Sequence, residues 1–266
     1  MIVDICGRSD VGLVRQRNED SYLYGNLESG DRSTQADPRP ITVRDAPALM
    51  VVADGVGGAV SGELASSIAT ACIFSELQMW WRSGSGRDSS TVPRAMRHAI
   101  DVANEAIWGE AQGASAHHGM GTTVTIALIV HGEVHFGQIG DSRGYLIRGK
   151  EVRQLTKDQS LVQRLIDAGR MTRSQAEKSE HRNIILQALG PEQTVVSDLY
   201  QENLKKGDFV LVCSDGLSNQ VSEEEIAQYA RDAKKPGDLC AALMQRALET
   251  GAPDNVTALA AMIGAP

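Results

Sequence analysis

The chain has 266 residues, of which 42% are hydrophobic and 23% charged, a composition typical of a globular protein that is large enough to fold without disulfide or metal cross-links. Its 34 acidic side chains outnumber its 26 basic ones, and the net charge of −8 disfavours a nucleic-acid-binding protein. No apolar run approaches the ~18 residues that a membrane-spanning helix needs, so we expect no membrane attachment.

The N-terminal residues and the cysteines indicate the compartment. Met1–Ser9 carries Asp4 and lacks the basic and apolar regions of a signal peptide. The cysteines lie far apart in apolar surroundings, which is typical of thiols packed as small hydrophobic side chains in a reducing compartment. They are Cys6, Cys72, Cys213 and Cys240. We therefore predict a cytoplasmic protein.

Two kinds of segment follow one another along the chain. Short β-branched runs predict buried strands at residues 49–53, 122–130, 133–139, 145–148, 209–213 and 256–263. Helical spacing of apolar residues predicts helices over 62–81, 91–111, 159–168, 223–232 and 236–250. The polar residues 28–47 predict a long surface loop, and the Gly/Ser-rich residues 82–90 predict a flexible link. Because strands and helices do not alternate strictly, the order favours an α+β fold of antiparallel sheets covered by helices.

Aspartates stand at the ends of these predicted strands. Asp54 and Asp215 each follow a buried strand and precede a glycine, and Asp254 stands directly before the last strand. Asp141 follows another strand end, and Asp20 closes a polar stretch. One such aspartate usually caps a turn, but a cluster of carboxylates raises its own pKa values unless a cation lies among them. Because oxygen ligands suit Mg²⁺ or Mn²⁺, the sequence predicts a carboxylate-held metal site.

Six short motifs occur in a fixed order along almost the whole chain. They are Arg15…Asn18-Glu19-Asp20, Asp54-Gly55-Val56-Gly57-Gly58, Gly121-Thr122-Thr123, Gly140-Asp141-Ser142-Arg143-Gly144, Ser214-Asp215-Gly216-Leu217 and Asp254-Asn255-Val256-Thr257. Each motif alone is weak evidence for any family. The ordered series, however, resembles the metal-dependent PPM family, the type 2C protein Ser/Thr phosphatases, and in particular its compact bacterial members. The resemblance implies one catalytic domain over residues 1–266, with a central antiparallel β-sandwich between helix pairs and a small flap at about residues 160–184.

The resemblance also implies two tightly bound Mn²⁺ or Mg²⁺ ions, which can turn a bridging water into a hydroxide that attacks the phosphorus directly. The residues that it assigns to the ions are Asp54 as the bridging ligand, the carbonyl of Gly55, Asp215 and Asp254 at the first metal, and Glu19 and Asp20 around the second. It assigns the substrate phosphate to Arg15, whose guanidinium matches two phosphate oxygens.

The sequence departs from the family pattern at two positions. Val56 stands where some members carry a histidine, which leaves a metal-bound water, His118 or His181 as the general acid. Asn219 stands where members often carry an aspartate that holds a third metal together with the equivalent of Asp141. Because ligand charge controls affinity for hard cations, we expect any third ion to bind more weakly here.

Three alternatives remain beside this interpretation. Residues 55–58 lack the later glycine or lysine of a nucleotide-binding loop. Cys240 and Arg246 have the spacing of a cysteine phosphatase, but the residues between them favour a helix. A catalytically dead member that binds phosphoproteins as a regulatory module is the third. We predict an active phosphatase for phosphoserine and phosphothreonine in proteins, acting as a monomer opposite a cognate Ser/Thr kinase.

Overall fold

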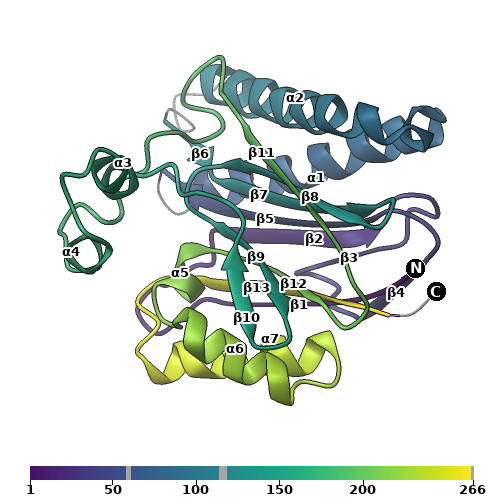
Figure 1. Ribbon diagram of the computed structural model, residues 1–266. Coiled ribbons are helices and arrows are strands. Elements are labelled where there is room, and N and C mark those ends of the chain that lie inside the picture. Colours follow the sequence, from purple (N-terminus) through teal and green to yellow (C-terminus); the bar gives the residue numbers. More distant parts are fainter. Residues whose placement is uncertain (58–60, 114–118, 265–266) are drawn as a thin grey trace.

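The computed structural model describes residues 1–57, 61–113 and 119–264, in which two antiparallel sheets lie face to face between pairs of helices (Figure 1). The six-stranded sheet has the order β10-β9-β12-β13-β1-β4. Its strands are Ile2–Asp10 (β1), Ile41–Arg44 (β4), Arg143–Arg148 (β9), Glu151–Gln154 (β10), Phe209–Cys213 (β12) and Val256–Ile263 (β13).

The second sheet has the order β11-β8-β7-β5-β2-β3, with the short strand β6 paired to β5. Its strands are Asp20–Asn26 (β2), Arg32–Thr34 (β3), Ala48–Val56 (β5), Gly121–Thr122 (β6), Val124–Val130 (β7), Glu133–Ile139 (β8) and Asp198–Asn203 (β11). Every pair of neighbouring strands in the two sheets is antiparallel, which hairpins and long loops can connect without βαβ crossovers.

Two helix pairs cover the outer faces of the sandwich. The long helices Ser61–Arg82 (α1) and Val92–Gly113 (α2) pack on the second sheet, and Glu223–Asp232 (α6) and Pro236–Glu249 (α7) pack on the first (Figure 1). Three short helices lie toward one end of the molecule: Leu161–Asp167 (α3), Arg173–Glu177 (α4) and Asp215–Ser218 (α5). No helix in the described part of the chain combines the length and apolarity needed to cross a membrane.

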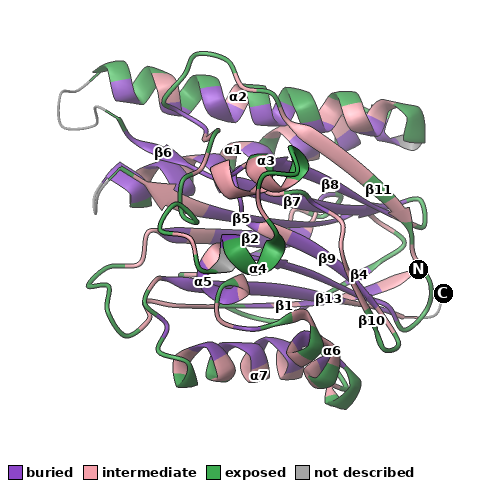
Figure 2. Cartoon of the chain, turned by 60° about the vertical axis from the view of Figure 1, so that its left-hand side comes forward, coloured by how far each residue is buried: buried purple, intermediate pink, exposed green. Residues whose placement is uncertain are grey.

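The core consists of three apolar layers, and strand β5 shows why. Leu49, Val51 and Ala53 point toward α1 and α2, whereas Met50 and Val52 point toward the other sheet. Because side chains alternate along a strand, a continuous apolar run is what a strand buried on both faces requires. Buried residues accordingly fill the middle of the molecule in Figure 2, and exposed ones cover the outer faces of the helices.

The predicted α+β sandwich between helix pairs is confirmed, and all six predicted strands are present. The prediction of a loop over residues 28–47 was wrong in part, because this segment contains the short strands β3 and β4. The link at residues 82–90 contains two 3₁₀ turns, Ser85–Arg87 and Ser89–Thr91. Strands β1, β2, β10 and β11 were not predicted, because they carry too many polar residues to read as buried runs.

Candidate metal centre

The strand ends that carry the predicted aspartates meet at one end of the sandwich, opposite the chain termini (Figure 1). Strands β2 and β5 pair antiparallel with Asp20 directly opposite Asp54, so these two carboxylates come from neighbouring positions of one sheet. Asp215 follows β12 and Asp254 precedes β13, and these two strands are neighbours in the six-stranded sheet, the one that does not contain β2 and β5. The two sheets therefore contribute acids to the same edge of the sandwich.

Asp20 is a buried carboxylate, 2% exposed, with only one satisfied oxygen. Its Oδ2 accepts hydrogen bonds from Ser214 Oγ (2.7 Å) and Thr257 Oγ1 (2.6 Å), whereas Oδ1 has no partner among the described residues. Burial raises the pKa of Asp20 to about 7 despite these two hydrogen bonds. A buried acid with an unpaired oxygen is costly to ionise unless a cation lies beside it.

The other acids raise each other's pKa. Burial, followed by the charges of Asp20 and Asp215, raises the pKa of Asp54 well above its ordinary value. Burial and the Asp215 charge raise the pKa of Asp141 to about 8. Burial and Asp254 raise the pKa of Asp215, although its hydrogen bond with Asp54 works in the opposite direction. The structure thus brings the five predicted aspartates close enough to repel one another.

The glycine after each strand-end aspartate is required by close packing. A Cβ on Gly55 would overlap the carbonyl of Gly62 in the first turn of α1, and a Cβ on Gly216 would overlap the carbonyl of Asn255. Backbone therefore approaches backbone at both positions, as only glycine allows. This contact holds the Gly55 peptide against the start of α1, directly after Asp54.

Arg15 lies in the loop between β1 and β2 and reaches the same site. Its guanidinium donates a hydrogen bond to Asp254 Oδ2 at 2.7 Å, and about half of its side chain (53%) stays exposed. Glu19, in the same loop, is partly buried, which raises the pKa of its carboxyl, while the charge of Arg15 lowers it. The structure therefore brings Arg15 and Glu19 to the aspartates, with Arg15 paired to one of them.

Asn255 is a residue of the site to which the sequence analysis gave no role. Its Oδ1 accepts the backbone N–H of Glu19 (2.8 Å), and its Nδ2 donates to the carbonyls of Val11 and Arg17 (both 2.9 Å). One side chain thus holds both ends of the loop that carries Arg15. Ser214 and Thr257 were likewise missed as hydrogen-bond donors to Asp20, although all three residues stand inside the quoted motifs, next to an aspartate or three residues from one.

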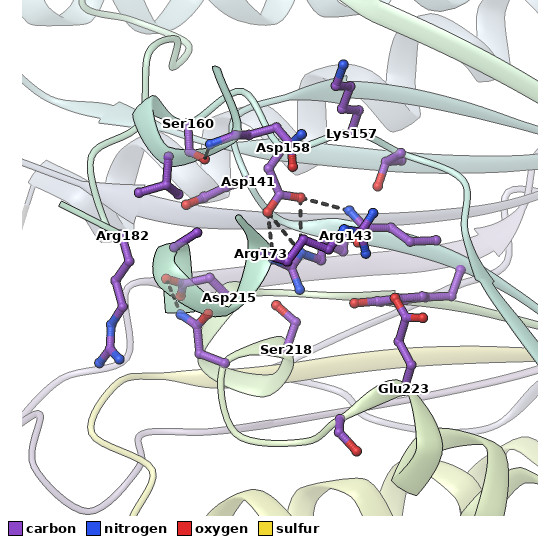
Figure 3. A pocket seen from close by; sticks show the side chains of 18 of the residues that line it. Asp141, Arg143, Lys157, Asp158, Ser160, Arg173, Arg182, Asp215, Ser218 and Glu223 are labelled. Atoms are coloured by element: carbon purple, nitrogen blue, oxygen red, sulfur yellow. Dashed lines mark hydrogen bonds and ion pairs between the residues drawn. The ribbon is translucent and has the colours of Figure 1, made fainter. Parts of the chain in front are cut away.

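Asp141 and Asp215 also line a cavity of about 930 Å³. The cavity lies between the flap, residues 160–184 with α3 and α4, and the start of α6. In the view of Figure 3, both acids stand between Arg182 on one side and Glu223 on the other. Asn219 lines it too, and its Nδ2 donates to Asp215 Oδ2 at 3.1 Å, so this asparagine contacts a predicted metal ligand directly.

The cysteine-phosphatase alternative fails on burial and position. Cys240 is fully buried in α7 and donates to the Cys6 carbonyl at 3.5 Å, and burial raises the pKa of its thiol. Arg246 pairs with Glu225 at the surface (2.7 Å), so the two residues form no phosphate cradle. Of the histidines considered as general acid, His181 is exposed in the flap, and His118 lies outside the described residues.

The donor set fits a hard cation in chemistry, although its side chains are not yet arranged as a ligand shell. Among the described residues, no group of three or more His, Cys, Asp or Glu side chains stands ready to hold a metal ion. Asp254 is instead turned to Arg15, and Asp215 to Asp54 and Asn219. The unpaired oxygen of Asp20 and the mutual repulsion of the carboxylates are what a divalent cation would relieve.

Comparison with known proteins identifies the family. The family model described as Protein phosphatase 2C matches residues 35–258. The chain belongs to the protein phosphatase 2C family. The predicted membership of the type 2C phosphatases is thereby confirmed.

Relatives of known name cover nearly all of this chain. The serine/threonine protein phosphatase PstP of Mycobacterium tuberculosis is 33% identical over 261 residues, which are 98% of this chain but 45% of PstP. This chain thus spans less than half the length of that relative. The serine/threonine phosphatase Stp of Listeria monocytogenes is 31% identical over 252 residues, which are 95% of this chain and 92% of Stp.

Solved structures of the family share the fold. The crystal structure of M. tuberculosis PstP matches with a TM-score of 0.81 at 32% identity over 100% of both chains. The catalytic domain of PstP in complex with two manganese ions matches with a TM-score of 0.79, also at 32% identity and over 100% of both chains. The sandwich and its helix pairs are therefore those of the protein phosphatase 2C family.

Proposed function

We propose that this chain is a Mn²⁺- or Mg²⁺-dependent phosphatase that hydrolyses phosphoserine and phosphothreonine in proteins. The observation that carries the proposal is the gathering of five aspartates and Arg15 at one edge of the sandwich, with one oxygen of the buried Asp20 unpaired. The names of the relatives PstP and Stp and the two manganese ions of the PstP catalytic domain support the same activity and cofactor.

The carboxylates and one backbone carbonyl would hold the ions. The ligands we propose are Asp54, Gly55, Asp215 and Asp254, with Glu19 and Asp20 beside them and Asp141 at a weaker third site. Bound ions supply a water activated at neutral pH and an electrostatic sink for the phosphate charge. Ser214 and Thr257 orient Asp20 through its Oδ2, which leaves Oδ1 free to face a cation.

Arg15 would bind the substrate phosphate. Its planar guanidinium can donate two parallel hydrogen bonds to phosphate oxygens and offset the charge that develops in the transition state. In the structure this guanidinium donates to Asp254, and Arg15 would be free to bind the phosphate where Asp254 serves as a metal ligand. Cys240, the residue weighed as a nucleophile, is buried in α7, and this supports direct attack by water without a phospho-enzyme.

The retained acids and Arg15 also favour an active enzyme over a dead phosphoprotein-binding module. We further propose a monomer of one catalytic unit over residues 1–266, a flap at about 160–184 that borders the substrate, and a cognate Ser/Thr kinase as the opposing enzyme. All four cysteines are free thiols, which supports a location in the reducing cytoplasm.

The test is hydrolysis of p-nitrophenyl phosphate and of a phosphothreonine peptide with Mn²⁺, with Mg²⁺ and with EDTA. We expect activity that requires the metal and is absent in EDTA. Binding of the phosphopeptide without any metal-dependent hydrolysis would favour the regulatory module instead. Trapping of a covalent phospho-enzyme by rapid quench would contradict direct attack.

A further inference from the structure

Gln159 lies in the stem of the flap, where the chain leaves the sandwich and returns to it. The stem is closed by backbone hydrogen bonds from Leu186 N–H to the Gln159 carbonyl (2.7 Å) and from Leu161 N–H to the Ile184 carbonyl (2.9 Å). Between them, Ser160 and Ile185 form an isolated antiparallel bridge. Any movement of the flap relative to the sandwich therefore acts on Gln159.

Gln159 also binds both backbone polar groups of Gly140, the residue before Asp141. Its Oε1 accepts the N–H of Gly140 at 2.9 Å, and its own N–H donates to the Gly140 carbonyl at 2.8 Å. Gly140 has a φ of +97°, and a Cβ there would lie 2.6 Å from Thr123 Cγ2. The turn that presents Asp141 is thus fixed on one side by packing and on the other by Gln159.

The third contact of Gln159 is to the neighbouring edge strand. Its Nε2 donates to Asp198 Oδ2 at 2.8 Å and to the carbonyl of Val196 at 3.3 Å. Asp198 is the first residue of β11 and pairs with Gln138 of β8, the strand that leads to Asp141. With its backbone and side chain together, Gln159 joins the flap, the start of β11 and the Asp141 turn.

Gln187 provides a natural comparison on the same stem. Its Oε1 accepts the N–H of Val196 at 3.0 Å and its Nε2 donates to the Val196 carbonyl at 3.1 Å. Gln187 is, like Gln159, a partly buried glutamine whose amide both donates and accepts, but among the described residues its side-chain hydrogen bonds reach Val196 and not the Asp141 turn. A role specific to Gln159 must therefore be absent at Gln187.

We propose that Gln159 is a positioning residue that fixes the Asp141 carboxylate at the wall of the cavity and couples it to the flap. The inference rests on the proposed function, because Asp141 has a chemical task only as a ligand at the third metal site. Asp141 is 9% exposed and lines the cavity. Its backbone is positioned by the preceding residue, Gly140, whose N–H and carbonyl are both hydrogen-bonded to Gln159. Partners that orient a ligand typically change metal affinity or activity by about 10- to 100-fold when they are removed.

The experiment compares Gln159→Ala with Gln187→Ala by two readouts. In metal-free protein, hydrogen exchange of the segment around Gly140 and Asp141 should be faster in Gln159→Ala and unchanged in Gln187→Ala. In the phosphatase assay, Gln159→Ala should need about tenfold more Mn²⁺ for half-maximal activation, with the KM for p-nitrophenyl phosphate at saturating Mn²⁺ unchanged. Gln187→Ala should follow the wild type.

A rescue variant tests the hydrogen-bond chain itself. Gln159→Glu keeps an acceptor for the Gly140 N–H but places a second carboxylate against Asp198, so it should raise the Mn²⁺ requirement. Adding Asp198→Asn restores a donor–acceptor pair with the roles exchanged, and the Mn²⁺ requirement should return toward that of the wild type. Failure of this rescue would overturn the proposed chain.

Two further results would overturn the inference: equal exchange in the two alanine variants, or a Mn²⁺ activation curve of Gln159→Ala that superimposes on the wild-type curve. A wild-type protein without metal-dependent hydrolysis would instead overturn the proposed function. In that case the exchange comparison, which needs no metal, still decides whether Gln159 fixes the Asp141 turn.

Discussion

An aspartate lies near each end of strand β12, and the two acids have opposite charges around them. Asp208, directly before the strand, is 1% exposed and accepts hydrogen bonds from Arg148 Nε (2.9 Å), from the terminal guanidinium nitrogen Nη2 of Arg148 (2.7 Å) and from the Lys205 N–H (2.7 Å). Asp215, two residues after its end, faces other carboxylates, and burial together with Asp254 raises its pKa. Burial of an acid is therefore no sign of a functional site; burial among like charges is.

The largest loss of activity is expected from removing one of the five clustered aspartates. Asp54→Ala removes the acid that we propose as the shared ligand, so turnover at saturating Mn²⁺ should fall to the level seen in EDTA. The metal-free variant should be at least as stable as the wild type in urea unfolding, because the repulsion among the remaining acids is smaller. Near-normal turnover would remove Asp54 from the site.

Removing Asp208, the acid paired with Arg148 at the start of β12, should lower stability and leave activity unchanged. Asp208→Ala leaves the Arg148 guanidinium without its carboxylate and should lower the free energy of unfolding by about 3 kcal/mol. Because Asp208 lies at the other end of β12, kcat at saturating Mn²⁺ should stay at the wild-type value. Urea unfolding and steady-state kinetics of the same preparation measure both quantities. Lost turnover in a folded variant would contradict the separation of the two ends.

Arg15→Ala should weaken binding of the transition state more than it lowers the stability of the fold. We expect a loss of about 2–3 kcal/mol of transition-state stabilisation, so kcat/KM for p-nitrophenyl phosphate should fall on the order of 30- to 160-fold. Arg17→Ala is the matched control, because Arg17 is an exposed arginine of the same loop that joins the site through its backbone carbonyl. Equal effects of the two substitutions would remove the specific role from Arg15.

The smallest effect is expected from Asn219→Asp, which adds one more carboxylate to the clustered acids. Asn219→Asp places a carboxylate beside Asp215 in the cavity that Asp141 also lines. Since ligand charge controls affinity for hard cations, the highest-concentration step of Mn²⁺ activation should move several-fold lower. Asp141→Ala should lower turnover and remove that step. Superimposable curves for wild type and Asn219→Asp would leave Asn219 as a residue that only orients Asp215.

The sequence predicted the elements whose pattern is continuous. Strand β12 and residues 48–53 of β5 are unbroken apolar runs, and β7 is interrupted only by Thr125, whereas β11 is polar and β3 and β4 span 3 and 4 residues at sheet edges. Edge strands need apolar residues on one face at most, so pairing with a neighbour decides their structure. Such pairing is invisible in a single sequence.

The acids of the site were visible as strand ends, but their supports were not. Ser214 and Thr257 bind Asp20 across 194 and 237 positions of sequence, and Arg15 meets Asp254 across 239. These contacts depend on which strands become neighbours in the folded sandwich. The stem contacts of Gln159 were missed for the same reason, because nothing in the local sequence distinguishes Gln159 from Gln187.

The most direct test of the gathered carboxylates is the free energy of unfolding as a function of pH without metal. Burial raises the pKa values of Asp20 and Asp141 to about 7 and about 8, from 3.8 in the unfolded chain, so between these values the folded protein binds more protons than the unfolded chain. Stability in EDTA should therefore fall as the pH rises from about 4 to about 8, and Mn²⁺ should restore it at the alkaline end. The decline should be shallower in Asp54→Ala, a comparison in which the titration of other groups such as His135 cancels. A stability that stays level or rises with pH in EDTA, with no gain from Mn²⁺, would contradict a cation site at this edge of the sandwich.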